Sequence, residues 1–500
     1  MKQPRISPAQ SGAFPRRAVG TPAAHRDSRA LARLAGALLA GAFLTAGCAV
    51  GPDYKRPPVP TAATFAEPGP WKTAEPRDGL PKPEWWKVFH DPALDALEAQ
   101  AQTASPTLQS AMARYDAALA VARISRSALI PGLAVNPSGA RERFSGHRQV
   151  QPGSTRFAYT TNTFDVPLDL TYELDIFGQA RRALESAREA AAAQGALYQN
   201  VLLTLEAGVA QNYFSLRALL SQQALLRQNV SLLSDTLDLV RKLRKGGVNS
   251  DLDLYQAQAQ LEAVQSTALA VDQSIATQLH ALAVLIGKTP ESFSIAAMAL
   301  DLDPPEVPVG LPSDLLERRP DVAAAERTLA SLNAQVGVAK AAFFPSIGLT
   351  AYAGLNSNDL NNLISSGSRE WGVGPAISIP IFRGGALIAG YDVAKANYQA
   401  AVAAYQGQVL SAFQDVEDGL SNLRYLAQQS EVLDHAVKDS QKVADISTLR
   451  YKNGLVSYLE VIDAQRTLLQ NQISFANTRA QRFISTVLLV KAVGGGWQPN

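Results

Sequence analysis

The chain has 500 residues and a mass of 53.3 kDa, which exceeds the size of one ordinary domain. Apolar residues make up 47% of it and charged residues 18%, a balance that excludes a wholly disordered chain and a helical multi-span transporter. The formal charge of +2 is unevenly distributed, because the first 47 residues carry seven basic residues against Asp27 and leave the remainder at −4. We therefore expect no nucleic-acid partner once that segment is removed.

The residue types that carry enzymatic chemistry are few and scattered. One cysteine cannot form an intramolecular disulfide, and five dispersed histidines are a poor ligand set for zinc. The histidines lack an HExxH or nucleophile-elbow context, and the glycine-rich segments lack a phosphate-loop motif. We therefore expect no enzymatic activity, no metal and no cofactor.

Residues 1–47 are typical of an export signal. A basic segment precedes the apolar run 34–48, LAGALLAGAFLTAGC, which is shorter than the about 20 residues of a transmembrane helix. Its end, TAGC, resembles a bacterial lipobox, which implies cleavage before Cys48 and acylation of that cysteine. The alternative is a buried free thiol. Residues 48–84 are rich in proline and are predicted to form an extended tether.

The body of the chain is predicted to be a tandem duplication. Two pairs of prolines, each 25 residues apart, are related by an offset of 214: Pro106 with Pro131, and Pro320 with Pro345. The segment from Gly246 also matches the segment from Asn453 at an offset of 207. The predicted parts are a first repeat at 85–290, a linker at 291–312, a second repeat at 313–493 and a tail at 494–500.

Each repeat is predicted to contain a helix, two strands, a very long helix, a tight turn and another helix. The first helix covers 92–130 in the first repeat. The long helices cover 179–245 and 386–452, each 67 residues and about 100 Å long, and the helices after the turns cover 252–286 and 458–490. Helices of this length, with apolar residues at coiled-coil spacing, predict an elongated and mostly helical fold.

The strand pairs are expected within 131–176 and 345–382. Apolar residues occupy every even position from Phe164 to Ile176, while acidic and hydroxyl residues occupy most odd positions. This alternation is typical of a half-buried soluble strand, or of a transmembrane barrel strand of about 9–11 residues. Four strands cannot close a barrel, so the chain must oligomerise if these strands span a membrane.

Several segments together resemble the outer membrane factors of Gram-negative efflux systems, of the NodT and OprM lipoprotein type. They include GCAVGPDYKRP at 47–57, YELDIFG at 172–178, IPIFRGG at 379–385 and VGGGW at 493–497. The resemblance implies a TolC-like homotrimer with a roughly twelve-stranded outer-membrane barrel and a periplasmic helical tunnel. It also implies a periplasmic adaptor, a proton-driven inner-membrane pump, outer-membrane lipid as surroundings and small-molecule substrates. The alternative is a lipid-anchored periplasmic coiled-coil scaffold or adaptor without a pore.

The candidate functional residues lie in the two turns between the long helices and the helices that follow. Gly247 and Gly454 suit left-handed helix stops. Ser250 with Asp253 resembles a capping box, as does Ser457 with Glu460, so both carboxylates have a structural explanation.

The resemblance implies that the second turn lines a closed periplasmic aperture. Glu460 and Asp463 match the acidic ring of the family and Tyr451 its latch tyrosine, with Asp253 as a further candidate for the lumen. Val456 stands where some relatives carry a latch arginine. Three copies of each carboxylate around one axis predict a cation site that acts as a selectivity filter. The aperture is expected to open when the tip helices untwist.

Overall fold

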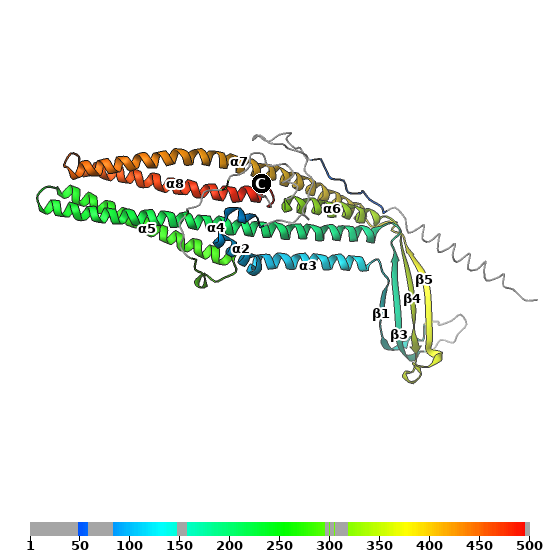
Figure 1. The fold of residues 1–500 in the computed structure, drawn as a ribbon. Coiled ribbons are helices and arrows are strands. Elements are labelled where there is room, and N and C mark those ends of the chain that lie inside the picture. Colours follow the sequence, from blue (N-terminus) through cyan, green and yellow to red (C-terminus); the bar gives the residue numbers. More distant parts are fainter. Residues whose placement is uncertain are drawn as a thin grey trace, which may run out of the picture.

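The computed structural model describes residues 49–58, 84–147, 158–295, 300, 305 and 319–495, so Cys48 and most of the predicted tether and linker lie outside it. An elongated helical bundle meets a single sheet at one end (Figure 1). The larger helices are α2 (Pro92–Ala104), α3 (Pro106–Ser127), α4 (Gln179–Lys245), α5 (Asp251–Leu285), α6 (Pro320–Ala341), α7 (Ala386–Lys452) and α8 (Tyr458–Ala492). The short 3-10 helices are η1 (Trp85–Phe89), η2 (Pro290–Ser292), η4 (Leu360–Asn362) and η5 (Ser366–Ser368).

The single helix predicted at 92–130 is wrong, because two helices occupy this range. Ser105 lies between α2 and α3 in an extended conformation, with φ −66° and ψ 120°. Pro106 has no N–H to donate and disfavours a helical residue before it, so it ends one helix and occupies the first turn of the next.

The two long helices, α4 and α7, each run for 67 residues over the predicted ranges. Each is preceded by a glycine with left-handed φ, Gly178 at 82° and Gly385 at 85°. At the far end of the bundle α5 folds back on α4 and α8 folds back on α7, which gives two helical hairpins side by side (Figure 1).

The sheet has five antiparallel strands where the sequence predicts four. They are β1 (Gly132–Val135), β2 (Ser138–Phe144), β3 (Tyr159–Leu174), β4 (Ser346–Ser357) and β5 (Arg369–Ser378). Both β1 and β2 pair with β3, so they form one interrupted row, followed by β3, β4 and β5. The interruption falls at Asn136 and Pro137, because proline cannot donate to the ladder.

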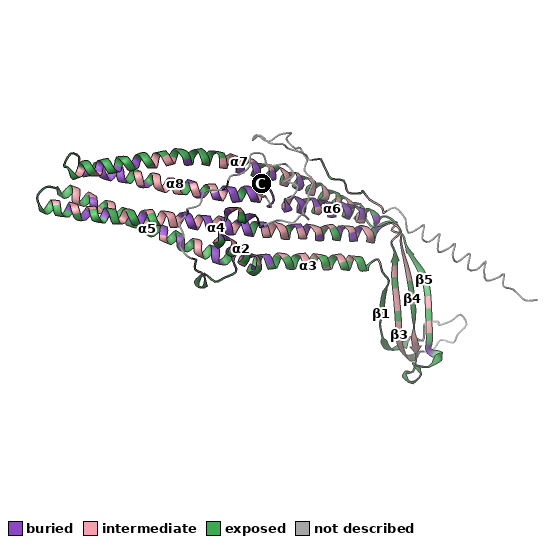
Figure 2. Cartoon of the chain, in the orientation of Figure 1, coloured by how far each residue is buried: buried purple, intermediate pink, exposed green. Residues whose placement is uncertain are grey.

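Burial is concentrated in the middle of the bundle and not in the sheet (Figure 2). Trp85, Phe89, Phe214 and Phe483 form an aromatic core in which the Phe214 and Phe483 rings stack 4.8 Å apart. None of the residues of the five strands is buried. The sheet therefore has no packed layer on either face within one chain.

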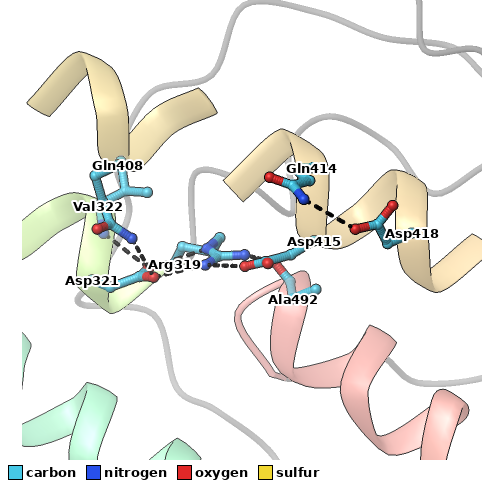
Figure 3. Close-up of polar contacts among 8 residues, drawn as sticks. All are labelled: Arg319, Asp321, Val322, Gln408, Gln414, Asp415, Asp418 and Ala492. Carbon is cyan, nitrogen blue, oxygen red and sulfur yellow. Dashed lines mark hydrogen bonds and ion pairs between the residues drawn. The ribbon is translucent and has the colours of Figure 1, made fainter. Parts of the chain in front are cut away.

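A buried arginine connects three helices in the second half of the chain through hydrogen bonds (Figure 3). Arg319, just before α6, donates to Asp321 at 2.7 Å, to Asp415 of α7 at 2.9 Å and to the carbonyl oxygen of Ala492 at 2.9 Å. Because Arg319 is only 6% exposed, these acceptors supply the partners that its guanidinium loses when it leaves water. The contacts link α6, α7 and the end of α8.

Candidate functional site: the helical tip and the sheet

Both tip turns end their long helices in the same way. Gly247 has φ +71° and Gly454 has φ +72°, the left-handed values that the sequence predicts. The N–H groups of Val248 and Leu455 donate to carbonyl oxygens of the last helical turn at 2.9 Å. This is the Schellman arrangement, which favours glycine at the left-handed position because glycine has no Cβ.

The first capping box forms. The Ser250 side-chain oxygen accepts from the Asp253 N–H at 3.2 Å, and the Asp253 carboxylate accepts from the Ser250 N–H at 3.1 Å. The second predicted capping box is wrong, because Ser457 makes no side-chain cap contact. The Glu460 carboxylate lies instead 3.6 Å from Arg450 across the turn. A cation at the end of α7 therefore attracts the side chain that would otherwise cap α8.

The two acidic candidates on α8, Glu460 and Asp463, each have a basic neighbour within the chain. Asp463 forms an ion pair with Arg466, three residues later on α8, and both side chains are more than half exposed. Arg466 is a residue that the sequence reasoning missed, although spacing of three along a helix brings side chains together. Within one chain the acidic positions are thus part of two ion pairs.

Tyr451 joins the two hairpins. The Asn249 side-chain N–H donates to the Tyr451 hydroxyl at 2.7 Å, across 202 residues of sequence. The Tyr451 ring also lies 5.4 Å from the ring of Tyr458, which is 1% exposed. Burial, with Tyr451 adding to it, raises the pKa of Tyr458 to about 12. Sequence reasoning missed Asn249 and Tyr458, since nothing local marks either residue.

Beside these contacts lies a cavity of about 530 Å³ between the two hairpins. Side chains of α4, α7 and α8 line it, including Asp235, Tyr451 and Gln465. The tip itself exposes apolar side chains, with Val248 73% and Leu455 68% exposed. No group of three or more side chains suited to a metal ion occurs in the described part of the chain.

The two faces of the sheet differ sharply in chemistry. Because directly opposed residues share a face, the register assigns every strand position to one side. One face is apolar along β3, as at Leu168 and Leu170, and stays apolar on β4 at Leu349 and Leu355. All acidic residues of the strands lie on the other face: Glu142, Asp165, Asp169, Glu173 and Glu370.

The first described residues run along the junction between sheet and helices. The Val50 N–H donates to the Phe177 carbonyl oxygen at 3.0 Å, and the Arg182 guanidinium donates to Asp53 at 2.6 Å. Arg56 reaches Glu326 of α6 at 2.8 Å. The segment that follows Cys48 is therefore held at the connection between β3 and α4. Cys48 itself lies outside the described residues.

The family model described as outer membrane efflux protein matches residues 97–288 and again residues 311–495. The chain belongs to the outer membrane efflux protein family. Among similar proteins, the probable efflux pump outer membrane protein TtgC of Pseudomonas putida is 34% identical over 459 residues, covering 91% of this chain and 94% of TtgC. Outer membrane protein OprJ of Pseudomonas aeruginosa is 31% identical over 463 residues, covering 91% of this chain and 94% of OprJ.

Solved structures agree with this assignment. The outer-membrane channel OprN superposes with a TM-score of 0.82 at 31% identity, covering 90% of this chain and 100% of OprN. The open state of the MtrE outer membrane channel of Neisseria gonorrhoeae superposes with a TM-score of 0.77 at 31% identity, covering 90% of this chain and 98% of MtrE.

This outer membrane efflux protein is therefore the outer-membrane channel component of an efflux system and has the TolC-like fold. The predicted family, function and location are confirmed. The relatives are channel components and not enzymes, and they lend no support to the alternative of a scaffold without a pore.

Proposed function

We propose that three copies of this chain form one passive conduit through the outer membrane. The observation that carries this proposal is the sheet, which is uncovered on both faces, apolar on one and acidic on the other. Four rows of strands are too few to close a barrel, and three copies give about twelve. The acidic face then lines an aqueous lumen and the apolar face meets lipid.

Exposed apolar surface on the helices also supports contact between copies. Of the described helices, α5 alone is long and apolar enough to cross a membrane, and only 17% of its apolar window is buried. It runs beside α4 at the end of the bundle far from the sheet (Figure 1). We therefore assign its uncovered face to a neighbouring copy in a periplasmic tunnel, with the two halves of each chain acting as tandem repeats.

The tip of the bundle is proposed as the periplasmic gate. Tyr451 holds the two hairpins together through Asn249, and Glu460 and Asp463 line the aperture together with their arginine partners. Asp253 is the weakest candidate, because the capping box already uses its carboxylate. Opening separates the hairpins, a shift between two packings of the same helices. Val456 supplies no polar contact of the kind a latch arginine would make.

The partners are proposed to be a periplasmic adaptor, docking on the apolar tip around Val248 and Leu455, and a proton-driven inner-membrane pump. Such a pump supplies the energy, so this chain needs no cofactor and no catalytic site. Relatives are named as antibiotic and toluene efflux pump proteins of Pseudomonas putida. We propose small organic solutes of this kind as substrates.

Cys48 is proposed to carry the lipid anchor. The segment 49–58 begins beside the start of α4, at the level where the sheet leaves the membrane, so an acyl chain on Cys48 reaches the inner leaflet. Mass spectrometry of the mature N-terminal peptide tests this proposal. An acylated Cys48 is expected, and an unmodified thiol or an uncleaved leader would contradict it.

The gate is tested by single-channel recording of the purified trimer in a planar bilayer. We expect a small cation-selective conductance in the wild type. The double variant Glu460→Ala, Asp463→Ala should have a larger conductance and lose its cation selectivity. Tyr451→Phe should also have a larger conductance but keep its cation selectivity, because it loses only the hydrogen bond to Asn249.

The matched control is Asp439→Ala, which removes another exposed ion pair of the same spacing, with Lys442, well away from the turn. Wild-type behaviour of both gate variants would reject the gate assignment and leave the channel intact. Absence of any pore from well-folded trimers would reject the conduit.

A further inference from the structure

Three arginines interrupt the apolar face of the sheet, all near its end far from the helices. Arg141 and Arg143 lie in β2, and Arg369 is the first residue of β5. The register places Arg141 opposite Asn162 and Arg143 opposite Thr160, at even positions of β3. Even positions carry the apolar side chains, so both arginines project from the face that we assign to lipid.

Arg369 belongs to the same face. It lies opposite Leu355 of β4, which in turn lies opposite Val166 of β3. Two positions further along β5, Trp371 projects from this face with 77% of its surface exposed. Tryptophan is enriched at the boundary between hydrocarbon and headgroups. Arg369 is therefore one same-face position beyond this tryptophan and lies in register with Val166, near the outer end of the apolar stretch of β3.

Arg141 and Arg143 also lie at the right height. From Phe164 to Leu174 the apolar face of β3 covers ten residue steps, about 33 Å along the strand and about 25 Å in thickness at a tilt of about 40°. This matches the apolar band of an outer-membrane barrel. Arg141 and Arg143 lie opposite the next two even positions, just beyond the band, where a charged side chain meets polar headgroups.

These three charges have no counterion on their own face. All three side chains are exposed, and none makes an ion pair or a side-chain hydrogen bond within the described residues. Every acidic residue of the strands projects from the opposite face of the sheet. The lipid face of each protomer thus carries three positive charges and no negative one in its strands.

We propose that Arg141, Arg143 and Arg369 bind the phosphate groups of lipopolysaccharide at the outer rim of the barrel. The guanidinium fork matches a phosphate in two hydrogen bonds, and the adjoining apolar band accommodates acyl chains, which a free phosphate lacks. The inference rests on the proposed barrel, whose closure pairs β5 of one copy with β1 and β2 of the next. Arg369 then joins the other two arginines at each boundary between copies.

The test measures binding of lipid A to the purified trimer by native mass spectrometry, with bisphosphorylated and dephosphorylated lipid A as probes. In the triple variant Arg141→Gln, Arg143→Gln, Arg369→Gln we expect affinity for the bisphosphorylated form to fall about fivefold per arginine, or roughly a hundredfold in all. Affinity for dephosphorylated lipid A should not change. The corresponding lysine variant should retain part of the binding, because it keeps the charge but loses the paired hydrogen bonds of the guanidinium.

The matched control is Glu142→Gln with Glu370→Gln, since these residues adjoin the arginines in sequence but project from the other face. Equal affinity of the wild type and the triple variant for bisphosphorylated lipid A would overturn the proposal. So would an equal loss for both lipids, or displacement by millimolar inorganic phosphate.

Trimer formation on a non-boiled gel checks the fold of each variant. If the triple variant does not assemble, the three single variants are each expected to lose about fivefold. Channel recording separates this proposal from the barrel on which it rests. A conducting trimer without phosphate preference overturns the lipid site alone, whereas a well-folded trimer that does not conduct overturns the barrel.

Discussion

Glu98 is a carboxyl group without a polar partner inside the helical bundle. It is fully buried on α2, and neither of its side-chain oxygens has a hydrogen-bond partner within the described residues. Glu206 of α4 is nearby and accepts from Trp85 at 3.0 Å and from Gln102 at 2.9 Å. Burial raises the pKa of Glu98 to about 10, and the negative charges of Glu206 and Asp95 contribute to this rise.

This raised pKa makes stability depend on pH. The folded protein keeps a proton on Glu98 that the unfolded chain releases near its ordinary pKa of about 4.3. The contribution of Glu98 to the free energy of unfolding is therefore fully present below the unfolded pKa and is lost as pH rises toward the folded pKa. We expect Glu98→Gln, which is neutral at every pH, to raise the apparent Tm at pH 9 by roughly 2–4 °C and to change it little at pH 5.

Thermal unfolding in detergent at the two pH values measures this difference. Glu291→Gln, at an exposed position, is the control and should follow the wild type. An unchanged pH slope in Glu98→Gln would mean that Glu98 is ionised in the folded protein.

At the scale of single elements, the tip turns combine a predictable backbone with side-chain contacts that are not predictable. The Gly residue and the preceding cations indicate where α4 and α7 end, and the helices end there. The partner of Glu460 is different from the one expected, because the capping-box pattern takes account only of α8 and not of Arg450 on the preceding helix.

The adjacent glycines Gly246 and Gly247 allow a matched test of the helix stop. Gly247 has φ +71° with nothing within 4 Å of an added Cβ, whereas Gly246 has an ordinary φ of −81°. Only backbone strain therefore opposes Gly247→Ala, at a cost of about 1 kcal/mol. We expect hydrogen exchange at the Val248 N–H to accelerate about fivefold in Gly247→Ala and to stay near wild type in Gly246→Ala. Equal rates in the two variants would show that the left-handed turn does not hold this end.

At the scale of the whole molecule, the sheet is stable only when something covers its two faces. Leu168 and Asp169 are neighbours on β3 that project from opposite faces. In the middle of the apolar band a lysine costs about 2–4 kcal/mol, whereas a lumen position tolerates charge. We expect Leu168→Lys to reduce the yield of assembled trimer in the outer-membrane fraction severalfold and Asp169→Lys to leave it near wild type. Similar yields would assign the Leu168 face to something other than lipid.

The sequence by itself determined the ends of the long helices, the strand alternation and the family, because these features depend on residues close together in the chain or on motifs in a fixed order. The tertiary structure alone decided which groups meet. The Asn249–Tyr451 hydrogen bond joins residues 202 positions apart, and the placement of three arginines on one face follows from strand register. Local spacing predicts the face of an element, but packing between elements decides what that face contacts.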